Sequence, residues 1–194
     1  MSILRYFVPG NFYHIITRGN NKQQIFFFRR DYLRYLKNLE KYSKKFNIQA
    51  LAYCLMPNHV HLLVKQKSET TVTDFMQSLN TAYSMYFNIK HSRSGHLFQG
   101  PFKHVLVETE EYLVHLSRYI HLNPSSANLA RKPENYPWSS YKYYLGLEQN
   151  DFIDKEFILS HFAKKDGVGD YKDFVDSRID YQRDISFQKL LLEK

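Results

Sequence analysis

Two histidines separated by one apolar residue are the first candidates for chemistry in this sequence. His59 and His61 flank Val60. On a β-strand, residues two apart project from the same face, with about 6 to 7 Å between their Cα atoms, so both imidazoles could bind one metal ion. The sequence offers no Cys-x-x-Cys and no second close histidine pair, which disfavours a structural zinc site. A catalytic divalent cation, with water or substrate completing its coordination, stays open.

A second group of candidates lies about sixty residues further along the chain. Tyr119 and Asn123 are four residues apart and would share one face of a helix. A tyrosine hydroxyl can attack a phosphodiester and form a phosphotyrosine that conserves the bond energy for rejoining. Arg118 could neutralise developing charge, although helix neighbours point about 100° apart. Because the sequence contains 16 tyrosines, chain position alone does not select Tyr119.

Apolar periodicity predicts the elements that position these residues. The predicted strands are 12–17, 48–55 and 60–64, and the predicted helices are 32–46, 72–89 and 108–122. The segment 97–107, broken by Gly100 and Pro101, is predicted as a strand or a bent hairpin. Asp31 is the expected N-cap of the first helix, Thr71 or Thr73 that of the second, and Pro124 should end the third. The order β-α-β-β-α-β-α predicts an α+β fold of the ferredoxin-like or RRM-like split βαβ type, an antiparallel sheet with helices on one face.

Charge is distributed unevenly along the 194 residues. The formal net charge is +8; up to Leu145 there are 19 basic and 8 acidic residues, and beyond it 8 basic and 11 acidic. A basic body of this kind suits a polyanion such as nucleic acid. We therefore predict one catalytic domain over 1–145 and an acidic, helical appendage over 146–194, with short amphipathic patterns near 157–162 and 171–175.

Composition excludes several classes of protein. The chain is 43% hydrophobic and 16% aromatic, which is too apolar for a disordered chain, and no stretch approaches the roughly 18 to 20 apolar residues of a membrane span. Its start has no apolar region or cleavage site of an export signal. The single cysteine, Cys54, is typical of a reducing compartment. We expect a cytoplasmic protein without membrane partners, associated with the nucleoid when bound to DNA.

Four blocks of sequence resemble one known family, in the same order. They are HIITRGNNKQ (14–23), LMPNHVHLLV (55–64), GHLFQGPFK (95–103) and RYIHLNP (118–124), the last followed by YPWSS (136–140). Together they span about residues 10 to 145. They are similar to the HUH endonucleases, and specifically to the single-tyrosine transposases of small insertion sequences and their REP-associated relatives.

The resemblance implies a fold, a reaction and a set of site residues. Tyr119 would be the nucleophile, and His59, His61 and Asn123 would hold Mg²⁺ or Mn²⁺. The implied activity is DNA transposition and recombination by cleavage of single-stranded DNA near a hairpin, leaving a 5′-phosphotyrosine and a free 3′-OH that allow rejoining. A homodimer, and a tyrosine helix that serves either its own subunit or a partner, both stay open.

Basic and amide side chains near these blocks are the candidate DNA contacts. We expect them to be Arg18, Asn20, Asn21, Lys22, Lys103 and Arg118. Cations and amides on the loop after the first strand suit phosphates and splayed bases, with Phe98 or Phe102 available for stacking. The two adjacent asparagines equally suit a simple turn.

Three other functions compete with transposition. A rolling-circle initiator or relaxase would use related HUH chemistry, but the sequence shows no helicase or P-loop motif. A non-catalytic RRM-like nucleic-acid-binding module has the same element order, yet no segment matches the basic-Gly-aromatic pattern of its stacking platform. A metal hydrolase would need further carboxylate or histidine ligands, which the sequence does not place near the pair.

Overall fold

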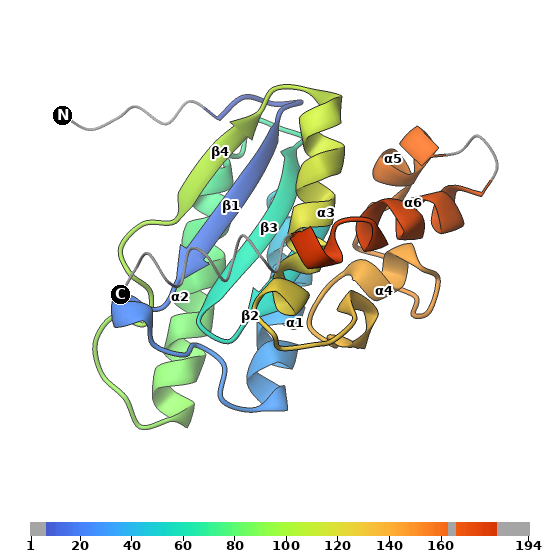
Figure 1. Cartoon of the computed structure of the whole chain (residues 1–194). Coiled ribbons are helices and arrows are strands. Elements are labelled where there is room, and N and C mark those ends of the chain that lie inside the picture. Colours follow the sequence, from blue (N-terminus) through green and yellow to red (C-terminus); the bar gives the residue numbers. More distant parts are fainter. Residues whose placement is uncertain (1–6, 163–165, 182–194) are drawn as a thin grey trace.

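A four-stranded antiparallel sheet forms the centre of the protein (Figure 1). The computed structural model describes residues 7–162 and 166–181. The strands are β1 (Phe12–Arg18), β2 (Ile48–Met56), β3 (His59–Gln66) and β4 (Lys103–Val107), in the spatial order β2-β3-β1-β4. The α+β class and the split βαβ order predicted from the sequence are confirmed.

Two long helices cover one face of the sheet. These are α1 (Arg29–Lys45) and α2 (Val72–Lys90), which also pack against each other. Thr17 of β1 lies opposite Val60 of β3, and its hydroxyl accepts a hydrogen bond from Asn80 of α2 at 3.3 Å. Val60 and its alternating neighbours therefore face these helices. The residues between them, including both histidines of the pair, face the other way.

The third long helix, α3 (Glu110–Ser126), lies across that other face and contacts chiefly β2 (Figure 1). The sequence predicts that it ends before Pro124, and this is wrong, because Pro124 lies inside the helix. Pro124 sits in the last turn, where it removes only the backbone N–H bond that residue 124 would otherwise make to the carbonyl of Ile120. Asn123 consequently keeps its helical relation to Tyr119.

The helix starts follow capping rules, with one correction. Thr71 caps α2, and its hydroxyl accepts the backbone N–H of Asp74. Asp31 is not the N-cap of α1, since the helix begins at Arg29. Its carboxylate, in the first turn, instead accepts the backbone N–H groups of Phe27 and Phe28 at 3.0 and 2.9 Å.

The segment from Leu97 to Val107 is only partly a strand. β4 begins at Lys103, and the preceding residues run as a loop that bridges to the end of β1 through Gly19 and Phe98. The expectation that Phe98 or Phe102 is available for stacking on bases is wrong, because both side chains are buried. Each ring is more stable packed against the apolar core than exposed to water.

The C-terminal segment packs onto the body. After the short turn η2 (Pro133–Asn135) come α4 (Tyr141–Tyr144), α5 (Glu156–Leu159), η3 (Ser160–Phe162) and α6 (Gly167–Asp176). Helix α6 contacts α3, and Tyr171 and Val175 of α6 are fully buried. The predicted helical patterns near 157–162 and 171–175 are confirmed. The part of the predicted appendage beyond residue 181 lies outside the described residues.

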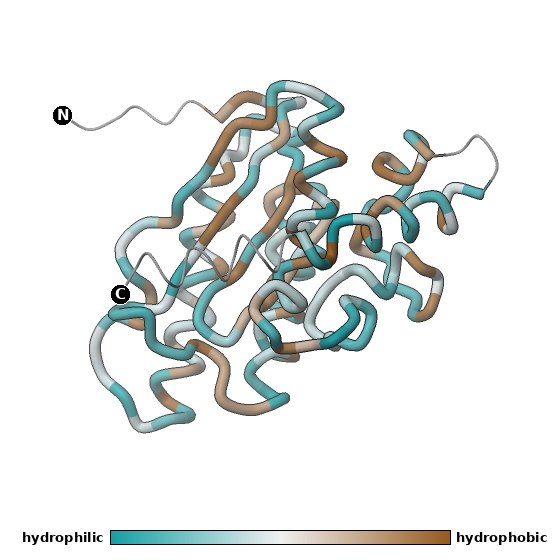
Figure 2. Tube along the Cα trace, viewed as in Figure 1, coloured by the Kyte–Doolittle hydropathy of each residue, from teal (hydrophilic) through white to brown (hydrophobic). Residues whose placement is uncertain are grey.

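Hydropathy follows this layered arrangement (Figure 2). Hydrophobic residues run along the strands, and hydrophilic ones colour the turns between elements. Within the described ranges, every helix falls short of the length and apolar character needed to cross a membrane.

The buried side chain of Asp31 connects the start of α1 to the end of α2 through hydrogen bonds. Its carboxylate is fully buried and is bonded by Lys90 Nζ at 2.7 Å, Tyr86 Oη at 3.0 Å and His91 Nε2 at 3.2 Å. Burial raises the pKa of this carboxyl, but the hydrogen bonds from Lys90 and the backbone of Phe28 outweigh it and hold the pKa at about 2.

We predict that Asp31→Asn destabilises the protein by about 2 kcal/mol at pH 7, as linkage between a lowered pKa and folding requires. The stabilisation is fully present above the unfolded carboxyl pKa near 4 and is lost as pH falls through the folded pKa of about 2. Urea unfolding of the wild type and of Asp31→Asn between pH 7 and 2.5 measures the difference in their free energies of unfolding. Glu40→Gln, on the exposed side of α1, is the control; equal free energies of unfolding for Asp31→Asn and wild type at pH 7 would refute the prediction.

Candidate active site

The histidine pair is joined by a third histidine on the neighbouring strand. His59 and His61 lie on β3, where they pair with Arg18 and Ile16 of β1. His14, two residues before Ile16, shares their face of the sheet. Its Nε2 lies 3.0 Å from His61 Nδ1, and the two rings stack with centroids 5.2 Å apart. The antiparallel register thus gathers three imidazoles on the face that α3 covers.

Burial keeps these imidazoles neutral. It lowers the pKa of His14 to about 4 and, together with the nearby Arg18 charge, that of His59 to about 4. The pKa of His61 is also well below its usual value, because of burial first and then the neighbouring His59 and His14. All three are therefore uncharged at neutral pH, and a neutral imidazole is the form that binds metal ions.

Tyr119 of α3 stands edge-on above this cluster. Its ring centroid lies 5.7 Å from that of His61 and 6.3 Å from that of His14, with interplanar angles of 90° and 79°. The side chain is 43% exposed, so one side is open to a ligand. Burial of the rest raises the pKa of its hydroxyl, and a hydrogen bond from Asn123 opposes that rise.

Asn123 completes the set of residues predicted from the sequence. It lies one helical turn after Tyr119, and its Nδ2 donates to the Tyr119 carbonyl at 2.8 Å. That bond leaves its amide oxygen as the available acceptor. The structure therefore brings Tyr119, Asn123, His59 and His61 to one place, although they are far apart in sequence.

The donor atoms present fit a divalent cation. His59 Nδ1 is bonded to Asn58 and His61 Nδ1 to His14, so Nε2 is the nitrogen of each ring that is not engaged by these neighbours. Metal-binding histidines are commonly held through their other nitrogen in this way. Two imidazoles and the Asn123 amide oxygen would bind the cation, and water and phosphate oxygens would complete its coordination. In the described ranges, no group of three or more His, Cys, Asp or Glu is arranged to hold a metal.

Two of the predicted DNA-contacting cations lie on the same face as the histidines. Arg18 is the direct β1 partner of His59. Lys103 of β4 pairs with Ile16, which in turn pairs with His61, so the three form one line across the sheet. Residues directly opposite in antiparallel strands point to the same side. Both cations are exposed and flank the histidines from β1 and β4.

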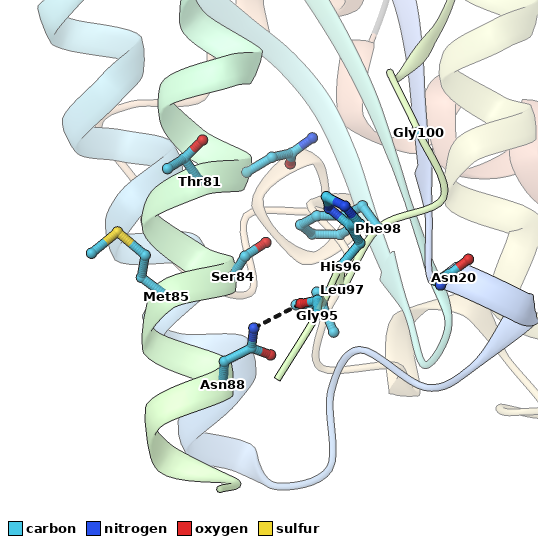
Figure 3. Close-up of a pocket in the computed structure, with 11 residues that line it drawn as sticks. Asn20, Thr81, Ser84, Met85, Asn88, Gly95, His96, Leu97, Phe98 and Gly100 are labelled. Atoms are coloured by element: carbon cyan, nitrogen blue, oxygen red, sulfur yellow. Dashed lines mark hydrogen bonds between the residues drawn. The ribbon is translucent and has the colours of Figure 1, made fainter. Parts of the chain in front are cut away.

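The turn after β1 carries the predicted contacts Asn20, Asn21 and Lys22. These residues form the short turn η1 (Asn20–Lys22), in which Asn21 and Lys22 have positive φ angles of 50° and 59°. Asn20 lines a cavity of about 590 Å³ between α2 and the loop 95–100 (Figure 3). In this cavity wall, Asn88 donates to the carbonyl of Gly95 at 2.9 Å.

Arg118 is not brought to the histidine cluster. Its guanidinium lies 4.0 Å above the ring of Phe174 in α6, and it also bonds the Phe174 carbonyl at 3.3 Å and His115 Nδ1 at 2.8 Å. Neighbours on a helix diverge, and here α6 takes up the side that Arg118 faces. Its contact with DNA stays a prediction.

A buried polar network behind α3 was not found from the sequence. Tyr171 Oη of α6 lies 3.0 Å from Ser117 Oγ and 2.8 Å from His121 Nδ1, and His121 Nε2 lies 2.8 Å from Ser140 Oγ. Burial lowers the pKa of His121 to about 3, so this imidazole is neutral. The network fixes α3 from the side opposite Tyr119. Its only sequence signal is the apolar pattern around Tyr171, which predicts a helix and not a bond to His121.

Comparison with solved structures shows a shared fold. The fold is similar to that of a REP-associated tyrosine transposase solved with a REP hairpin bound: the TM-score is 0.63 at 15% identity, covering 79% of this chain and 94% of that one. A Deinococcus radiodurans R1 protein provisionally assigned as a transposase aligns with a TM-score of 0.44 and 19% identity, over 62% of this chain and 95% of that one. No curated protein sequence matches the chain significantly.

The family follows from the sequence itself. Residues 8–123 match the family model described as "Transposase IS200 like". This stretch runs from β1 into α3 and includes His14, His59, His61, Tyr119 and Asn123. The chain belongs to the IS200-like transposases, and the resemblance inferred from the four sequence blocks is confirmed.

We predict that Tyr171→Phe lowers the free energy of unfolding by about 1 to 3 kcal/mol, because Ser117 and His121 lose a buried hydrogen-bond partner. Urea denaturation followed by circular dichroism measures the loss. Tyr181→Phe removes the same atom from an exposed side chain and serves as the control. A Tyr171→Phe protein as stable as the control would show that the network contributes nothing.

Proposed function

We propose that this transposase is a divalent-metal-dependent endonuclease and strand transferase that cuts single-stranded DNA near a hairpin. The observation that carries the proposal is the placement of Tyr119 over His61, with Asn123 one turn away and one side of the phenol open to solvent. A nucleophile, two neutral imidazoles and an amide oxygen thus converge on a site that a phosphate can enter.

The reaction is an exchange of one phosphodiester for another. Tyr119 Oη bonds to the scissile phosphorus and loses its proton, while the bond from phosphorus to the 3′ oxygen breaks and that oxygen gains a proton. The products are a 5′-phosphotyrosine and a free 3′-OH. Attack by a 3′-OH on the phosphotyrosine reverses the steps and joins strands, so no external energy source is needed.

The chain's own residues prepare this exchange. Because burial raises its pKa, the Tyr119 hydroxyl keeps its proton until attack, and the hydrogen bond from Asn123 favours its release. His59, His61 and Asn123 would hold Mg²⁺ or Mn²⁺, which supplies polarisation and orientation of the scissile phosphate when bound. Arg18 and Lys103 flank the site and would bind neighbouring phosphates.

The DNA partner and the domain organisation complete the proposal. The REP hairpin bound by the structural neighbour supports a DNA hairpin as the partner of this chain. Asn20, Asn21 and Lys22 would contact the strand as it passes the end of β1. We assign catalysis to 1–145 and a supporting role to 146–194, whose described helices pack on α3. Cytoplasmic location and a homodimer stay predictions.

The sheet face that carries His14, His59 and His61 also argues against a non-catalytic RRM-like module. Such a module stacks bases on aromatic residues of an open sheet face. Here α3 lies across the corresponding face, and histidines occupy the positions beneath Tyr119. The IS200-like family match likewise favours a transposase over an initiator or relaxase.

We predict that Tyr119→Phe abolishes covalent protein–DNA adducts while leaving DNA binding intact, because only the attacking oxygen is removed. The assay incubates full-length protein and Mn²⁺ with single-stranded oligonucleotides that carry hairpins from DNA flanking the gene. Adducts are resolved on denaturing gels, and binding is followed by fluorescence anisotropy.

Tyr112→Phe is the matched control, since Tyr112 is an exposed tyrosine on the same helix and lies about two turns from Tyr119. It should form adducts at the wild-type rate. An adduct that survives in Tyr119→Phe would overturn the assignment of the nucleophile.

A further inference from the structure

The turn between β2 and β3 is tied to the loop that follows β1. The Asn58 carbonyl accepts the backbone N–H of Gly19 at 2.8 Å, and the Pro57 carbonyl accepts that of Ile25 at 2.8 Å. A Cβ on Gly19 would lie only 2.1 Å from the carbonyl oxygen of Gln23, so no other residue fits there. These contacts give the backbone of Asn58 a defined position.

The orientation of the Asn58 amide follows from one of its contacts. Its Nδ2 donates to the backbone carbonyl of Lys22 at 3.2 Å. A carbonyl oxygen only accepts hydrogen bonds, so the NH₂ group must face Lys22. The amide oxygen then faces His59, where Oδ1 lies 2.6 Å from Nδ1.

That second contact determines which nitrogen of His59 carries the proton. An amide oxygen has no proton to give, so His59 Nδ1 must be the donor. A neutral imidazole has one N–H, and its Nε2 is then left with a free lone pair. Nε2 is the atom that the proposed function needs as a metal ligand.

We propose that Asn58 is a positioning residue that holds His59 as the Nδ1–H tautomer and so presents Nε2 to the divalent cation. The proposal rests on the metal site of the proposed function. It also joins that site to the turn at Lys22, because one amide group binds both. Contact of DNA with this turn and orientation of the metal-binding ring are thereby linked.

The other ligand shows why Asn58 is distinctive. His61 Nδ1 faces His14 Nε2, and either imidazole nitrogen can donate or accept. That pair permits two proton arrangements, of which one leaves His61 Nε2 free. Asn58 permits a single arrangement at His59.

The test compares Asn58→Ala with the wild-type full chain in two measurements. Long-range ¹H–¹⁵N NMR of the metal-free protein, with ¹⁵N-labelled histidine, identifies the tautomer of each ring. Calorimetric titration with Mn²⁺ measures affinity. We expect His59 to be Nδ1–H in wild type and a tautomer mixture in the variant, with Mn²⁺ affinity reduced about 10- to 100-fold, as when other residues that orient metal ligands are removed.

Two further variants separate this role from general damage to the fold. Asn58→Asp keeps an acceptor beside His59 and should restore the Nδ1–H tautomer. Asn88→Ala removes an asparagine that donates to a backbone carbonyl of another loop. It should change neither the His59 tautomer nor the Mn²⁺ affinity.

The outcomes distinguish this proposal from the one it rests on. A wild-type protein that binds no Mn²⁺ contradicts the proposed function. Wild-type Mn²⁺ binding together with an unchanged His59 tautomer and affinity in Asn58→Ala contradicts the role of Asn58 alone.

Discussion

The burial of three imidazoles on one face of the sheet is the constraint on which the site depends. His14, His59 and His61 are largely removed from water, where a charged ring is unfavourable, so they remain neutral and hydrogen-bond each other or Asn58. Such a cluster needs a cover, and α3 provides it. The cover also carries Tyr119 to the place where its phenol, two neutral imidazoles and the Asn123 amide oxygen meet.

The C-terminal segment takes part in this arrangement, because its helices α5 and α6 contact α3 directly. Tyr171 of α6 binds Ser117 and His121 on the buried side of α3, and Phe174 packs under the Arg118 guanidinium. The helix that carries Tyr119 is therefore held on one side by the sheet face that bears His14, His59 and His61, and on the other by α6. The C-terminal segment can be acidic and still pack on α3, because the residues that it packs with, such as Tyr171 and Phe174, are uncharged.

Much of this could be predicted from the sequence, and what could not has identifiable causes. The strands and helices followed from periodicity, and the His-x-His spacing placed two rings on one face because strand side chains alternate. The N-cap of α1 was predicted wrongly because an acidic residue in the first turn and an acidic N-cap look alike in sequence. The end of α3 was predicted wrongly because the effect of Pro124 depends on where in the last turn it lies. The contacts of His14, Asn58, Arg118 and Tyr171 depend on strand register and helix packing, which no local pattern contains.

The central claim is that Tyr119 is the residue that becomes joined to DNA. The direct measurement is tandem mass spectrometry of the adduct formed with a single-stranded hairpin oligonucleotide and Mn²⁺, after digestion with nuclease and trypsin. The tryptic peptide 119–131 contains a single tyrosine. The account predicts a nucleotide phosphate on that residue. The same modification on any other tyrosine, or cleaved DNA without a protein-linked nucleotide, would contradict it.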